Sequence, residues 1–318
     1  MRIRFWGTRG SIPVSLTWRD VRDRLAQSLV RANGRGLDTL EKAVAFMEQE
    51  LEFPLARTFG GHSSCVEFEP GSPEYFVCDV GSGARALGAH VFARQGGAPA
   101  VVNVFMSHVH WDHIMGFPFF GPAYVPGNTV RIHGCHAELE HAFRLQQEPP
   151  CFPVRFEQLG AKVEFVTLRP GETVEVGGVR VTPKLQRHGG DSYGYRFEAG
   201  GRCWVYSTDS EHKLDDLKET LTFVDFFRGA DLVVFDAMYS LADAISVKAD
   251  WGHSSNVVGV ELCQRAGAKR LALFHHEPAY DDATISRMLA ETQRLEELTR
   301  DGAPLEVFAA YDGLEVDL

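Results

Sequence analysis

The sequence lacks any long uninterrupted run of apolar residues. No such run approaches the roughly 20 residues that a membrane-spanning helix needs. A strand-like segment begins at Arg2, so we expect no secretory leader. The 318 residues, 44% of them hydrophobic, also contain no repeat, no low-complexity tract and no Pro/Gly-rich linker. These absences predict a cytoplasmic protein without a membrane partner, built as a single domain over residues 1–318.

Paired cysteines and positive charge are also lacking. The six cysteines are scattered without the paired spacing of a disulfide framework or a zinc knot, so we expect reduced thiols; they are Cys65, Cys78, Cys135, Cys151, Cys203 and Cys263. The net charge is −11, whereas proteins that grip long polyanions usually carry the opposite balance. Extended nucleic acid is therefore not an expected partner, although this balance does not exclude a local basic patch.

One segment is rich in metal-ligand side chains. His108, His110, Asp112 and His113 follow the apolar run 101–106. In an extended segment His108 and His110 project to one side and can grip one cation, whereas Asp112 and His113 come where the chain must turn and can face a second. Imidazole and carboxylate suit zinc, manganese or iron(II), and the absence of thiolate disfavours a structural zinc site. The pattern predicts two divalent metal ions.

Four side chains cannot complete two metal shells, so further ligands must come from elsewhere. His188, Asp209 and His275 each stand where a strand-like run stops, as expected for ligands carried on loops at one end of a sheet. His276 is a neighbouring alternative, but His275 is closer to the strand end.

These residues resemble a family. The His-x-His-x-Asp-His motif with a later His, Asp and His is similar to the metallo-β-lactamase superfamily. The segments 5–13, 190–196, 251–254 and 273–278 resemble its branch of phosphodiesterases, including cyclic nucleotide phosphodiesterases, and tRNA 3′-processing nucleases. The resemblance implies one metal held by His108, His110 and His188, the other by Asp112, His113 and His275, and a bridging Asp209. In the β-lactam-hydrolysing members a cysteine stands at the position of Asp209, which argues against antibiotic hydrolysis.

The resemblance also implies an α/β fold, a metallo-β-lactamase-like αβ/βα sandwich of two mixed β-sheets flanked by helices. Periodicity agrees, because short β-branched or aromatic runs alternate with helix-like stretches at about 84–95, 135–147, 213–228, 255–266 and 281–300.

A helical insertion is predicted at about 16–51. Val21, Leu25 and Leu29, and then Leu40, Val44, Met47 and Leu51, have helical spacing, with Asn33-Gly34-Arg35-Gly36 between the two sets. A packing element, a homodimer contact and an active-site lid remain open for this hairpin.

Catalysis is predicted to follow from the metals. A metal-bridging hydroxide would attack a phosphodiester, and Asp112 would help to orient the water. His253, in a Gly-His-Ser motif like that of the phosphodiesterase branch, is the candidate proton donor, with Asp236 behind it; its alternative is a residue next to a helix cap. Thr8, Arg9 and Ser11 form a turn that is a candidate substrate contact.

The leading function is hydrolysis of a small or cyclic nucleotide-type phosphodiester. The alternatives are tRNA 3′ processing, and ester, lactone or thioester hydrolysis. Only residues 189–208 separate His188 from Asp209, which is too few for the basic arm that the tRNA-processing branch inserts there.

Overall fold

The computed structural model describes residues 1–212, 216–240 and 251–318, and its strands form two seven-stranded sheets. The first sheet has the order β14-β1-β2-β3-β4-β5-β6 and the second the order β13-β12-β11-β10-β9-β8-β7. In the first sheet the strands are β14 (Glu315–Asp317), β1 (Arg2–Gly7), β2 (Cys65–Glu69), β3 (Tyr75–Cys78), β4 (Val101–Phe105), β5 (Thr129–Gly134) and β6 (Lys162–Thr167). In the second they are β13 (Glu306–Ala309), β12 (Arg270–Phe274), β11 (Leu232–Asp236), β10 (Arg202–Ser207), β9 (Ser192–Ala199), β8 (Val179–Gln186) and β7 (Val174–Val176).

Both sheets are mixed. Strands β3 to β6 run parallel while β14, β1, β2 and β3 pair antiparallel. Likewise β10 to β13 run parallel and β7 to β10 antiparallel. This confirms the two-sheet sandwich predicted from the sequence.

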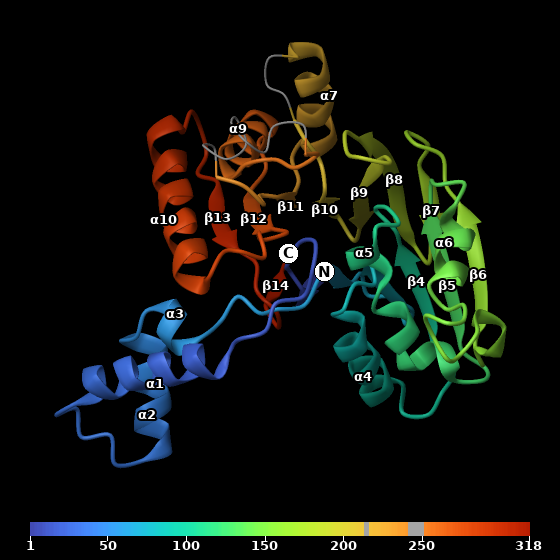
Figure 1. Cartoon of the computed structure of the whole chain (residues 1–318). Coiled ribbons are helices and arrows are strands. Elements are labelled where there is room, and N and C mark those ends of the chain that lie inside the picture. The colour runs from blue at the N-terminus through green and yellow to red at the C-terminus, as the bar shows by residue number, and fades with distance from the viewer. Residues whose placement is uncertain (213–215, 241–250) are drawn as a thin grey trace.

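Helices cover the outer face of each sheet (Figure 1). The helices are α1 (Trp18–Ala32), α2 (Leu40–Gln49), α3 (Phe53–Ala56), α4 (Ala84–Gln95), α5 (Trp111–Ile114), α6 (Leu139–Leu145), α7 (Leu217–Phe227), α9 (Asn256–Ala266) and α10 (Asp282–Thr299), with short 3₁₀ turns η1 (Phe117–Phe119), η2 (Gly121–Tyr124) and η3 (Phe156–Gln158). The predicted helix at 84–95 is reproduced, that at 135–147 is shorter, and part of that at 213–228 lies outside the described residues.

Three apolar clusters follow this layering. In β11, Val233 and Phe235 point into the cluster under α7, α9 and α10, whereas Leu232 and Val234 point into the cluster between the sheets. A third cluster lies between the first sheet and α4 and α6. A strand buried on both faces reads as a continuous apolar run rather than an alternating one. These strands are therefore recognisable in the sequence by their content of β-branched residues and not by alternation of apolar and polar residues.

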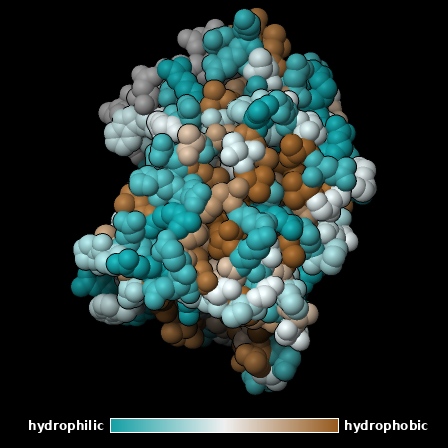
Figure 2. All heavy atoms as spheres, turned by 90° about the vertical axis from the view of Figure 1, so that its right-hand side faces the viewer, coloured by the Kyte–Doolittle hydropathy of each residue, from teal (hydrophilic) through white to brown (hydrophobic). Residues whose placement is uncertain are grey.

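The exterior is of mixed character. On the face toward the viewer in Figure 2, hydrophobic side chains are interspersed among hydrophilic ones, as is usual for protein surfaces. All six cysteines are free, as expected. No helix among the described residues is long and apolar enough to cross a membrane.

Candidate metal centre

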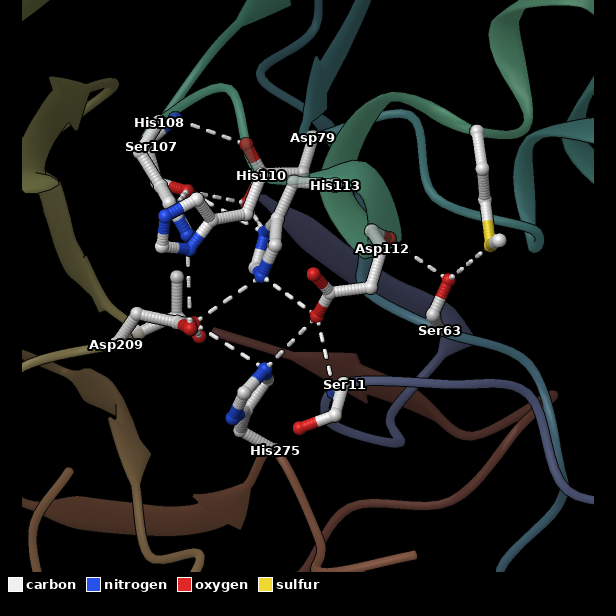
Figure 3. Close-up of polar contacts among 12 residues, drawn as sticks. Ser11, Ser63, Asp79, Ser107, His108, His110, Asp112, His113, Asp209 and His275 are labelled. Carbon is white, nitrogen blue, oxygen red and sulfur yellow. Dashed lines mark hydrogen bonds and ion pairs between the residues drawn. The ribbon is translucent and has the colours of Figure 1, made fainter. Parts of the chain in front are cut away.

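The predicted ligands converge on loops that follow four strands; Figure 3 labels all of them except His188. His108, His110, Asp112 and His113 follow β4, the last two of them within the one-turn helix α5. His188 follows β8, Asp209 follows β10 and His275 follows β12. Strands distant in sequence thus bring seven side chains together.

Close backbone contacts position α5 beneath the site. The amide of Gly116 donates to the carbonyl of Val80, and a Cβ at this glycine would lie 1.8 Å from the Gly81 carbonyl oxygen. Only glycine allows this approach.

The seven side chains form two groups, each able to hold an ion. His108, His110 and His188 form one, and Asp112, His113, Asp209 and His275 form the other. The ligand atoms within each group lie within 4.8 Å of one another, for example 3.1 Å between His188 Nε2 and His110 Nδ1. Ligands about 2.0–2.2 Å from a shared tetrahedral ion have such separations.

Asp209 lies between the groups. Its Oδ1 is 3.2 Å from His113 Nε2 and 3.3 Å from His275 Nε2, both in the second group. Its Oδ2 is 3.7 Å from His108 Nε2 and 3.8 Å from His188 Nε2, both in the first. One carboxylate oxygen therefore faces each group.

Hydrogen bonds aim the imidazoles. His113 Nδ1 donates to Asp79 Oδ2 over 2.7 Å, and His188 Nδ1 donates to the carbonyl of Gly252 over 2.8 Å. Such contacts fix which nitrogen carries the proton and leave the other nitrogen for a metal. The Nε2 atoms of His108, His113 and His275 are buried without a hydrogen-bond partner. These unpartnered ring nitrogens lie within the two groups and are free to bind a metal. The residues present therefore fit divalent cations.

Electrostatics agree with a cation site. Burial disfavours the charged form of His113, yet Asp209, Asp112 and Asp79 raise its pKa well above the usual range. Burial alone would raise the pKa of Asp209, but His275, His113 and His108 hold it well below its usual range. The carboxylates thus impose a negative potential that positive charge must balance.

Backbone strain collects here as well. Five non-glycine residues have positive φ in the described chain, and four of them touch or adjoin the site: Ser11, Asp79, Asp209 and His275, with φ from 43° to 61°. Such conformations cost free energy and concentrate at functional sites.

Asp79 is a site residue that we did not predict from the sequence. Its Oδ2 also accepts hydrogen bonds from the Ser107 and Tyr206 hydroxyls, at 2.7 and 2.8 Å. The usable signal was its place directly after a buried strand in Cys78-Asp79-Val80-Gly81, the same signal that selected Asp209.

His253 and Asp236 lie beside the metal groups. His253 Nδ1 is 2.8 Å from Asp236 Oδ2, and its ring is 5.1 Å from that of His188 and 5.2 Å from that of His275. Burial lowers the pKa of His253, but the charge and hydrogen bond of Asp236 outweigh burial and raise it to about 9. A donor atom of His253 also lies within 4.8 Å of those of His188 and Asp209, so the geometry allows a ligand role too.

The turn at residues 8–11 is only partly at the site. The Ser11 amide donates to Asp112 Oδ2 over 2.9 Å. Thr8 is fully buried, and its hydroxyl lies 3.1 Å from the Phe59 carbonyl. Arg9 is 3% exposed and donates to the carbonyls of Gly60, Glu277 and Tyr280. Ser11 therefore contacts a candidate metal ligand, while Thr8 and Arg9 hold neighbouring loops together through hydrogen bonds to backbone carbonyls.

The pair His275 and His276 divides between two roles. His275 points at Asp112 and Asp209, whereas His276 Nε2 donates to the Ala310 carbonyl over 2.8 Å. Of the two, His275 is the one whose ring nitrogen faces the metal groups.

Comparison with known proteins settles the family. The model of the beta-lactamase superfamily domain matches residues 75–276. The chain belongs to this superfamily. It is 23% identical over 291 residues to a ribonuclease Z of Haloarcula marismortui, covering 76% of this chain and 87% of that protein.

Two solved structures share the fold. The metallo-beta-lactamase fold protein YhfI of Bacillus subtilis aligns with a TM-score of 0.64 at 19% identity, covering 99% of this chain and 98% of that one. Zn(2+)-bound PqqB of Methylobacterium extorquens aligns with a TM-score of 0.62 at 16% identity, covering 100% of both chains. The superfamily and fold expected from the sequence are confirmed, and the curated relatives of the chain include ribonuclease Z proteins.

Proposed function

We propose that this protein hydrolyses phosphodiester bonds of a small or cyclic nucleotide-type substrate at a dinuclear metal centre. The placement of Asp209, with one carboxylate oxygen toward each ligand group, is the observation that carries the proposal. His108, His110 and His188 would hold one ion, and Asp112, His113 and His275 the other. Zinc suits these donors best, and manganese or iron is compatible with them.

The residues of the chain would divide the chemistry among them. When bound, two divalent cations lower the pKa of water and neutralise charge on a phosphoryl group. Asp112, fixed by the Ser11 amide, would help to orient the water. His253, whose pKa the hydrogen-bonded Asp236 raises, would give its proton to the departing alkoxide.

Two observations favour a small substrate over precursor tRNA. The net charge of −11 disfavours binding an extended polyanion. Residues 192–207 between His188 and Asp209 form β9 and β10 of the second sheet, so this segment forms no protruding basic arm. The ribonuclease Z relatives keep tRNA 3′ processing as the second candidate.

Two exposed tryptophans adjoin the site and offer surfaces for a nucleobase. Trp111, 69% exposed, stands between His110 and Asp112 in the chain, and Trp251, 62% exposed, precedes Gly252. Stacking of a base on an aromatic ring is worth about 1–3 kcal/mol. Trp111→Ala should therefore raise KM for a nucleotide diester and leave KM for a dialkyl phosphodiester unchanged.

A substrate panel tests the proposal. Zinc- and manganese-loaded protein is assayed with bis(p-nitrophenyl) phosphate, p-nitrophenyl phosphate, cyclic nucleotides, a precursor tRNA, a lactone and a thioester. We expect diester turnover to exceed monoester turnover, and cyclic nucleotides to exceed the tRNA. Preferred cleavage of the tRNA would make the second candidate correct, and preferred turnover of the lactone or thioester would overturn phosphodiester hydrolysis.

A further inference from the structure

Helix α1 exposes its apolar stripe. Trp18, Val21, Leu25 and Leu29 recur every three or four residues and therefore share one face of the helix. Their exposed fractions are 66, 53, 58 and 64%, and no residue of α1 is buried. An amphipathic helix normally turns such a stripe toward a partner, because helical stability in proteins comes mainly from packing of that face.

The side of α1 that turns toward the rest of the chain is a different one. Arg24, Ser28 and Ala32, spaced four residues apart, are its half-buried positions. Arg24 donates to the Arg57 carbonyl over 3.0 Å and pairs with the buried Asp282 of α10. This polar attachment fixes the helix and leaves the leucine stripe facing outward.

Helix α2 repeats the arrangement. Phe46 is buried and Ala43 and Ala45 are half-buried, whereas Leu40, Val44 and Met47 are 76, 42 and 42% exposed. Three of the four residues that the sequence pattern marks as the packing face are again exposed within the described chain, whereas Leu51, beyond the end of α2, is buried.

The arm formed by α1 and α2 is firmly anchored. Phe53 of α3, directly after the arm, packs against Phe59 and Tyr311, with ring centroids 4.4 and 5.4 Å away, and Arg24 of α1 pairs with Asp282 of α10. Figure 1 shows the arm extending from α10 away from both sheets. The exposed stripes are therefore presented by a fixed element at the edge of the molecule.

Area and charge both fit a second copy of this chain. The four stripe residues of α1 expose roughly 450 Å² and the three of α2 roughly 300 Å², so an interface of standard size, which buries about 800 Å² per partner, would use both stripes. Residues 18–52 carry six basic and seven acidic side chains, so the arm is nearly neutral in a chain of net charge −11. A near-neutral apolar surface can pair with itself around a two-fold axis, whereas a basic surface would favour an acidic partner.

We infer that the α1–α2 arm is a homodimerisation element, in which the apolar stripes of two copies pack against each other. The arm's role as an interface rests on packing alone and does not depend on the proposed hydrolytic activity.

Sedimentation equilibrium of the metal-loaded full chain tests the inference. The wild type should be a dimer at micromolar concentration. Leu25→Glu/Leu29→Glu should weaken association by more than roughly 100-fold. A few anchor residues carry most of the binding energy of an interface, and this variant replaces two of them with charged side chains. The milder pair Leu25→Ala/Leu29→Ala should weaken it less and keep α1 helical, since alanine is a strong helix former.

The control is Leu298→Glu, which changes a leucine of 68% exposure on α10 outside the arm. It should leave the dimer unchanged, and all variants should retain the wild-type far-UV circular dichroism spectrum. A monomeric wild type, or a dimer that survives both double substitutions, would overturn the inference. An equal loss in the Leu298→Glu variant would do the same.

Discussion

His253 is hydrogen-bonded to Asp236, and both carboxylate oxygens of Asp236 accept hydrogen bonds from the backbone. Asp236 Oδ2 accepts from His253 Nδ1 at 2.8 Å and from the Ser210 amide at 3.0 Å, while Oδ1 accepts from the Met238 amide at 3.1 Å. Because Asp236 ends β11, the second sheet itself orients the imidazole.

Replacing His253 should separate proton donation from metal binding. For His253→Ala we expect unchanged metal content and a loss of about 10²- to 10⁴-fold in turnover of a diester with an alkoxide leaving group. The loss should be much smaller with p-nitrophenolate, which departs without a proton. Steady-state kinetics on both substrates and metal analysis check this, with the exposed His141→Ala as control. Loss of metal, or an equal loss on both substrates, would assign His253 as a ligand or positioning residue.

Removing the charge of Asp236 should shift the pH profile. His253 must be protonated to act as an acid, so kcat/KM should fall as the pH rises through its pKa. Asp236 raises that pKa, and Asp236→Asn should therefore move the falling limb to lower pH. Asp231→Asn, at the other end of the same strand and paired with Lys269, should not move it. If the falling limb of the kcat/KM profile stays at the same pH in Asp236→Asn, Asp236 does not set the pKa of the catalytic acid.

Removal of the Asp209 carboxylate should release metal. The zinc-loaded wild type should contain about two ions per chain, because the seven proposed ligands would fill two shells if both ions share Asp209. Asp209→Ala should bind less metal and lose diester hydrolysis, whereas Asp225→Ala, in an exposed ion pair, should match the wild type. Full metal content by elemental analysis of Asp209→Ala would exclude the bridging role.

Buried neutral histidines should make the fold sensitive to acid. Burial lowers the pKa of His133 and of His212 from 6.5 to about 4. Between pH 6.5 and pH 4 the two histidines are protonated in the unfolded chain but not in the folded one. The free energy of unfolding that is present near pH 7 is therefore lost as the pH falls toward 4. Each group contributes a slope of about 1.4 kcal/mol per pH unit in this window.

Urea unfolding at pH 7 and pH 5 measures this sensitivity. Between pH 7 and pH 5 the free energy of unfolding should fall by about 2 kcal/mol less in His133→Leu than in the wild type. His141→Leu, which changes an exposed histidine, should lose as much as the wild type. An unchanged pH dependence in His133→Leu would show that its proton does not contribute.

Local pattern was enough to select the candidate ligands that the structure brings together and to predict most elements of the fold. His108, His110, Asp112 and His113 are contiguous, and strand ends are visible in sequence, so His188, Asp209 and His275 could be selected one by one. The short edge strands β7 and β14 were missed, because three residues carry too little periodicity.

Contacts between distant segments decided the rest. The sequence by itself determined that α1 and α2 are helices with apolar stripes, since spacing is a local property. Only the tertiary structure showed that Arg24 rather than Leu25 faces the chain, that Asp79 supports His113, and that Arg9 is committed to backbone carbonyls. Which side chains meet depends on which helices and strands pack together. Burial of the core decides this packing for the whole chain, so no single segment contains the information.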